Sequence, residues 1–113
     1  MSAPLWYTDS RTFIVKGANE DALKLFGYSE QEFIGMSAVR LVAPFDLPRI
    51  NALRAEEKWG EVGSFTYVRK DGTQFLAAIR WHQSHYLETL CDCVIVTSVD
   101  ERACSANANE IGQ

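Results

Sequence analysis

The pattern of apolar and polar positions divides the chain into three parts. Residues 5–8 and 13–15 are short apolar segments on either side of the turn-forming residues 9–12, which predicts an N-terminal β-hairpin. Between residues 19 and 59, apolar side chains recur at intervals of three and four, as on the inner face of a helix. From residue 63 onward the period is two, which is typical of strands with one buried face. The predicted order is therefore two strands, three helices and three strands.

Capping signals set the bounds of the helical part. Asn19 can cap a first helix, and Gly27 can end it in the left-handed conformation. The segment Ser29-Glu30-Gln31-Glu32 has the pattern of a capping box, which predicts the start of a second short helix. Asp46 can cap a longer helix, which we expect to run from Leu47 to Trp59. The inner face of this helix is expected to hold Leu47, Ile50 and Leu53.

The last three segments predict an antiparallel meander. Asp71-Gly72 is typical of a two-residue type I′ hairpin turn, and we expect residues 83–89 to form the next loop. Strict alternation then assigns the two faces of the strands. The face toward the helices is expected to carry Phe65, Tyr67, Phe75, Ile79, Trp81 and Ile95, and the outer face Leu76, Leu90, Val94 and Val96. The pattern predicts an α+β fold in which short helices and one longer helix pack on one face of a five-stranded antiparallel sheet.

Composition and charge narrow the class of protein. The chain has 113 residues, of which 47% are hydrophobic, which suits one domain with a full core. We expect a single domain over residues 1–100, and a tail or the start of a signalling linker over the Ala-, Asn- and Ser-rich residues 101–113. The net charge of −4 argues against nucleic acid or an anionic membrane as a partner. Because no signal peptide or bilayer-length apolar run is visible, we expect a cytoplasmic location.

Three segments resemble motifs of the PAS superfamily, in the branch common in bacterial sensor kinases and cyclases. Asn19-Glu20-Asp21-Ala22 is similar to the start of the first PAS helix, and residues 26–35 (FGYSEQEFIG) are similar to the segment linking the next two short helices. Arg69-Lys70-Asp71-Gly72-Thr73 resembles the hairpin between the penultimate strands. The motifs follow in the family's order, and the resemblance covers about residues 5–102. It implies a sensory domain of a signalling protein, such as a two-component system.

The resemblance also implies a cavity between the long helix and the sheet. A small, largely apolar or aromatic ligand bound there would signal to an effector such as a histidine kinase or a diguanylate cyclase. Candidates to line this cavity are Leu25, Ile50, Leu53, Phe65, Tyr67, Phe75, Ile79, Trp81 and Ile95, although the same side chains could simply fill the core. The alternative is a ligand-free interaction module that forms a homodimer through its outer sheet face. Its interface residues would be Leu76, Leu90, Val94 and Val96.

We expect the cavity to hold no cofactor, and the sequence leaves a flavin as an open alternative. Flavin photosensors of the family need a Cys in Gly-x-Asn-Cys, and alignment on Gly35 places Ala38 there, so a thiol adduct is excluded. The long helix contains no His for haem, and a metal site built on His82, Cys91 and Cys93 lacks a fourth ligand. A redox flavin could use Trp59 and Trp81, which could equally be core residues.

The sequence carries none of the common catalytic motifs, and the end of its last strand departs from the family pattern. The sequence contains no nucleophile elbow, no H-E-x-x-H and no P-loop, so we expect that the protein is not an enzyme. Many PAS domains end in Asp-Ile/Val-Thr-Glu-Arg, which couples the last strand to a following helix. Here Ser98-Val99-Asp100-Glu101-Arg102 stands in its place, so a carboxylate lies two residues later. Whether that output contact survives is left open by the sequence.

Overall fold

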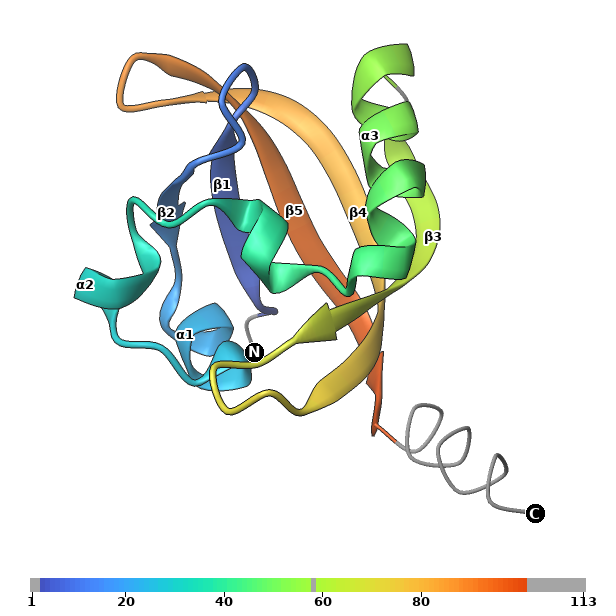
Figure 1. Ribbon diagram of the computed structural model, residues 1–113. Coiled ribbons are helices and arrows are strands. Elements are labelled where there is room, and N and C mark those ends of the chain that lie inside the picture. Colours follow the sequence, from blue (N-terminus) through green and yellow to red (C-terminus); the bar gives the residue numbers. More distant parts are fainter. Residues whose placement is uncertain (1–2, 58, 102–113) are drawn as a thin grey trace.

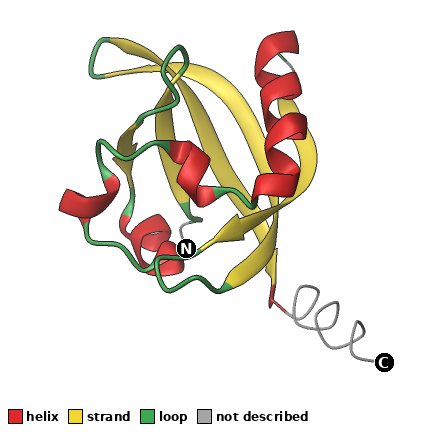
Figure 2. Ribbon diagram, viewed as in Figure 1, coloured by secondary structure: helices red, strands yellow, loops and turns green. Residues whose placement is uncertain are grey.

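A computed structural model describes residues 3–57 and 59–101. Five antiparallel strands form one curved sheet in the order β2-β1-β5-β4-β3, and the helical segments gather on one side of it (Figures 1 and 2). The strands are β1 (Leu5–Asp9), β2 (Val15–Ala18), β3 (Gly60–Val68), β4 (Gln74–Tyr86) and β5 (Thr89–Asp100). The helical segments are α1 (Glu20–Phe26), α2 (Glu30–Phe33), the 3₁₀ turns η1 (Ala38–Leu41) and η2 (Pro44–Asp46), and α3 (Leu47–Glu56). The predicted fold class is confirmed. Within the described ranges, no helix has the length and apolar character needed to cross a membrane.

The two short helices begin where the capping signals place them. The Asn19 side chain accepts hydrogen bonds from the backbone N–H of Ala22, at 3.0 Å, and of Leu5, at 3.1 Å, so it also ties α1 to β1. At α2 the Ser29 hydroxyl accepts from the Glu32 N–H, and the Glu32 carboxylate accepts from the Ser29 N–H. The capping box is therefore complete. These local bonds fix segments that are too short to be stable alone.

Asp46 attaches α3 to the sheet and does not cap it. Its buried carboxylate accepts from the backbone N–H of Thr66 on β3, at 2.8 Å, and from the Arg49 guanidinium, at 3.1 Å. The expected side-chain cap is absent. The helix also ends at Glu56, three residues earlier than expected, because Glu57 takes a left-handed conformation with φ of 53°.

The N-terminal hairpin is shifted relative to the prediction. The second strand begins at Val15, and Phe13 lies in the turn with a left-handed φ of 64°. The Asp9 carboxylate accepts from the N–H groups of Arg11 and Thr12 and so holds this turn together. Phe13 is therefore free of the strand ladder, and its side chain points into the core region.

Both later hairpin turns differ from expectation. In the β3–β4 turn Gly72 has positive φ but Asp71 does not, so the turn is not type I′. Strand β4 continues to Tyr86, so residues 83–89 are not a loop. A two-residue turn follows, in which Leu87 and Glu88 both have positive φ. These residue types rarely adopt that conformation, which is why the sequence gave no turn signal there.

A β-bulge reverses the faces of β5. The ladder with β4 pairs Ala78 with Ser98 but Ile79 with Val96, so Thr97 is an extra residue. An inserted residue shifts the alternation by one and moves every side chain before it to the other face.

The predicted faces of the residues before the bulge are consequently wrong. Val94 and Val96 belong to the buried core on the helix side, although alternation placed them on the outer face. Ile95, which was expected to face the helices, lies outside the core cluster and pairs with the exposed Arg80. A single Thr in a strand carries no signal of a bulge, so pattern reasoning could not locate this one.

Candidate functional site

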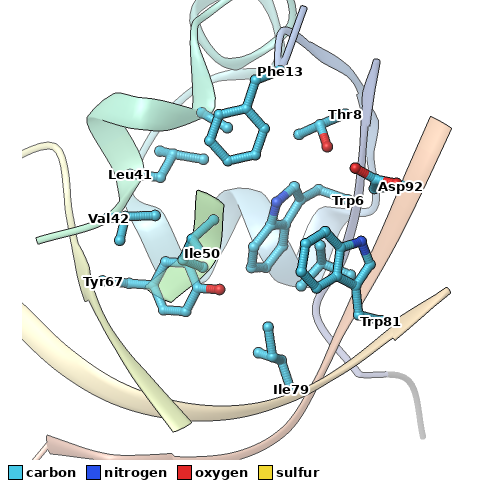
Figure 3. Close-up of a pocket in the computed structure, with 12 residues that line it drawn as sticks. Trp6, Thr8, Phe13, Leu41, Val42, Ile50, Tyr67, Ile79, Trp81 and Asp92 are labelled. Carbon is cyan, nitrogen blue, oxygen red and sulfur yellow. The ribbon is translucent and has the colours of Figure 1, made fainter. Parts of the chain in front are cut away.

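A small cavity lies between the sheet and the helical segments that cover it (Figure 3). Its volume is about 20 Å³, which is room for about one water molecule. Strands β1, β3, β4 and β5 supply one wall, and η1, α3 and the turn after β1 supply the other. The lining residues are Trp6, Thr8, Phe13, Ala38, Leu41, Val42, Ile50, Tyr67, Ile79, Trp81, Asp92 and Val94.

Most of the cavity wall is aromatic or aliphatic. Trp6 meets Tyr67 edge to face, with ring centroids 5.6 Å apart and planes at 83°. Burial, and to a lesser extent the charge of Asp46, raises the pKa of the Tyr67 phenol far above its ordinary value, so the phenol is neutral at any physiological pH. The wall therefore suits an apolar, flat occupant.

One end of the cavity is polar. Thr8 on β1 and Asp92 on β5 are register partners, and Trp81 comes from the neighbouring β4. Figure 3 shows the Thr8 hydroxyl, the Asp92 carboxylate and the Trp81 indole nitrogen at the same end. Thr8 Oγ1 and Trp81 Nε1 are fully buried, and neither has a hydrogen-bond partner among the described residues. Burial raises the pKa of Asp92, and the nearby indole N–H opposes this rise although it lies outside hydrogen-bond geometry.

Arg54 of α3 provides the counter-charge to Asp92. Its Nε lies 3.8 Å from Asp92 Oδ2, which is an ion pair without a hydrogen bond, and this Nε also has no hydrogen-bond partner in the described part of the chain. The guanidinium is held from the other side, because Nη2 donates to the Ser10 carbonyl at 3.1 Å and Cζ lies 4.2 Å from the centre of the Phe13 ring. Burial raises the pKa of Asp92, and the attraction of Arg54 opposes this rise.

Four of the nine predicted ligand-lining residues lie on the cavity: Ile50, Tyr67, Ile79 and Trp81. The other five do not. Phe65 and Phe75 are fully buried elsewhere in the core, and each has an arginine guanidinium over its ring. Leu25 and Leu53 are partly buried against the core, and Ile95 is on the outer face.

Pattern reasoning missed the polar end of the cavity. Asp92 is the one carboxylate within the otherwise apolar stretch from residue 90 to residue 96, and that isolation was a usable signal. Thr8 and Phe13 gave no signal, because their roles depend on the β1–β5 pairing and on the left-handed turn. The other missed lining residues are Trp6, Ala38, Leu41, Val42 and Val94.

The outer sheet face is only partly as predicted. Leu76 is half-buried and Leu90 is exposed, so these two members of the expected dimer interface remain a prediction.

Cys91 and Cys93 are buried free thiols on this face. Tyr7, beside Cys93, stacks on Tyr86 with ring centroids 4.4 Å apart. Among the described residues, no group of three or more metal-ligating side chains comes together.

The cavity as it stands in this structure is too small for a flavin. A volume of about 20 Å³ is far below the several hundred Å³ of a typical cofactor pocket. Ala38 lines the wall at the position where a photosensor would need its thiol. Trp59, proposed for a redox flavin, is 40% exposed, is not among the residues that line the cavity, and meets Trp81 edge to face with ring centroids 5.9 Å apart.

Comparisons with known proteins agree with this architecture. The family whose model matches residues 3–101 is described as a PAS domain. A PAS domain from Desulfitobacterium hafniense superposes with a TM-score of 0.72 at 18% identity, covering 87% of this chain and 93% of that one. A PAS domain from a two-component sensor histidine kinase gives 0.70 at 15% identity, covering 83% and 82%. A light-oxygen-voltage domain studied with a flavin analogue gives 0.72 at 17%, covering 97% and 87%. No curated protein sequence matches the chain significantly.

Proposed function

The chain belongs to the PAS domain family, and on that premise we propose that it is a sensory domain that detects a small, largely apolar or aromatic molecule in the cavity between helices and sheet. The observation that carries the proposal is the pairing of an aromatic wall with buried polar atoms that have no protein partner. A core that only had to be stable would avoid such atoms, because each costs about 1–3 kcal/mol. A cavity of this composition is therefore better explained by recognition than by packing.

The cavity must enlarge to admit a ligand, and the segment bearing Phe13 is suited to move. Phe13 lines the cavity from the β1–β2 turn in a left-handed conformation that a bulky residue rarely adopts. Arg54 rests on its ring and on the Ser10 carbonyl of the same turn. A ligand that displaces the Phe13 ring would therefore also shift Arg54 and, with it, the C-terminal half of α3.

Strand β5 gives a route from the cavity to an effector. Asp92 and Val94 line the cavity, and the same strand continues to Asp100 at the end of the sheet. There Glu101 pairs with Arg69 at 2.9 Å, and Arg69 also donates to the Leu25 carbonyl at 2.8 Å. The carboxylate that follows the last strand is thus tied to α1 and to the β3–β4 hairpin. We propose that this contact passes the signal to an effector such as a histidine kinase or a diguanylate cyclase.

A ligand-free interaction module is the second candidate function, and the small volume of the cavity favours it. In that case the domain would form a homodimer through its outer sheet face. The face is less apolar than the sequence suggested, since Val94 and Val96 point inward and the neighbouring Arg80 and His82 are exposed. The cytoplasmic location and the absence of catalysis stay predictions.

Ligand binding can be tested with toluene as an aromatic probe. Amide chemical shifts of the labelled protein are recorded during titration, and shifts clustered around the cavity are the expected result. Val42→Ile adds one methylene to the cavity wall and should lower the apparent affinity for toluene at least tenfold. Val39→Ile makes the same change at an exposed site on the same turn and should leave them unchanged. If neither toluene nor its polar analogues produce shifts around the cavity, the ligand-free candidate is the correct one.

A further inference from the structure

We propose that the polar end of the cavity selects an uncharged aromatic ligand that carries a hydroxyl group, the chemistry of a phenol. This inference rests on the proposed function and assigns the ligand class of the same cavity. Three buried polar atoms, Thr8 Oγ1, Arg54 Nε and Trp81 Nε1, lack hydrogen-bond partners in the described residues. Thr8 is fully buried and Trp81 is 3% exposed, so bulk solvent does not reach them.

The donors and the acceptor at this end of the cavity favour a ligand group that can both donate and accept hydrogen bonds. Trp81 Nε1–H can only donate, Asp92 as a carboxylate can only accept, and the Thr8 hydroxyl can do either. Arg54 does not line the cavity and acts on it through its ion pair with Asp92. A ligand hydroxyl can donate to the Asp92 carboxylate and accept from Trp81 or Thr8. An ether or ketone would leave the carboxylate without a donor, and a simple amine cation would leave the indole without an acceptor.

Charge complementarity excludes ionised ligands. Asp92 and Arg54 lie 3.8 Å apart and neutralise each other, so the end of the cavity carries no net charge. An anionic ligand would meet the buried Asp92 carboxylate, and a cationic ligand would have to compete for that carboxylate with the Arg54 guanidinium, which is held on its far side by Ser10 and Phe13. In a buried site either encounter is costly, because neither charge can be compensated by water.

The walls select the rest of the molecule. Trp6 and Tyr67 present ring surfaces, while Ile50 and Ile79 are aliphatic, so one flat ring is favoured over a branched chain. The ligand must carry its hydroxyl at one end of the ring, since the polar atoms gather at a single end of the cavity (Figure 3). Phenol meets both conditions with the fewest atoms.

The experiment compares phenol, toluene and benzoate by the amide shift titration. We expect phenol to bind at least tenfold more tightly than toluene, which replaces the hydroxyl by a methyl group of similar size, and we expect no binding of benzoate. If toluene binds as tightly as phenol, the polar end does not select the ligand, while the proposed binding function stands. If benzoate binds more tightly than phenol, Arg54 governs the site and the inference is wrong. If none binds, the polar end holds water only and both proposals fail.

Two variants assign the selectivity to named atoms. Thr8→Val removes an unpartnered polar atom with little change of shape and should not weaken folding. Trp81→Phe removes the indole N–H but also part of a buried ring, so it should lower stability and enlarge the cavity. Both variants should lower the ratio of phenol affinity to toluene affinity several-fold. Val99→Thr, at an exposed site on β5, should change neither affinity. Equal losses for phenol and toluene in Trp81→Phe would show that the ring, and not its N–H, makes the contact, and would overturn the inference.

Discussion

The bulge at Thr97 can be tested by the same isosteric substitution at two valines of β5. Val96 is 3% exposed within the core, whereas Val99 is 39% exposed near the end of the strand. Without the bulge, alternation would place Val96 on the outer face, whereas Val99 follows the bulge, pairs with Ala77 and keeps its face. Val96→Thr would bury a hydroxyl without a partner, which costs about 1–3 kcal/mol, whereas Val99→Thr would leave the hydroxyl in water and should cost at most about 0.5 kcal/mol.

The assay is thermal and denaturant unfolding of the two variants beside the wild type. For a domain of this size, 1 kcal/mol shifts Tm by roughly 4–8 °C. We therefore expect Val96→Thr to lower Tm by roughly 5–20 °C and Val99→Thr by less than about 4 °C. The slope of the denaturant curve should not change, because both variants keep the same folded state. A loss for Val99→Thr equal to or larger than that for Val96→Thr would refute the bulge and the inward assignment of Val96.

Three further predictions concern named charges and the outer face. Burial raises the pKa of Asp92, so the folded protein binds a proton at this carboxylate more tightly than the unfolded chain does, and lowering the pH through the raised pKa stabilises the fold. Arg54→Met removes the opposing positive charge and should raise the pKa of Asp92 further, as measured by a carbon-detected NMR titration. A lower pKa in this variant would contradict the ion pair. Asp46→Ala should lower the free energy of unfolding by about 2–3 kcal/mol, because the buried Thr66 N–H loses its acceptor. Asp46→Asn keeps an acceptor oxygen and should lower it clearly less in the same denaturant assay. Equal losses of stability would count against this hydrogen bond. Ile95→Glu should keep the fold but reduce a homodimer to a monomer in light scattering, and a wild type that is already monomeric at high concentration would remove the dimer from consideration.

Local signals in the sequence predicted the parts of the fold that depend on neighbouring residues. The capping box at Ser29 and the cap at Asn19 involve partners three residues away, and both formed as expected. The predicted change to a strand period at residue 63 falls within β3, which begins three residues earlier, at Gly60. Where a long-range contact competed, the local prediction failed: Asp46 bonds to Thr66 on the sheet and does not cap α3.

The candidate site was predictable only in its apolar half. Periodicity placed Ile50, Tyr67, Ile79 and Trp81 on the inner faces of their elements, but the cavity itself was expected only from the family resemblance, and five other candidates do not line it. The polar half depends on strand register, since Thr8 meets Asp92 through the pairing of β1 with β5, and these residues are 84 positions apart in the chain (92 minus 8).

By itself, the sequence determined the order of elements, the α+β class and the apolar character of the core, because these depend on composition and on periods of two and of three to four residues. Tertiary structure alone decided which face of β5 is buried and which polar atoms share one end of the cavity. The physical reason is that one extra residue at Thr97 reverses the alternation without altering any local preference. A carboxylate, a hydroxyl and an indole from three strands can likewise become neighbours only when the sheet has assembled.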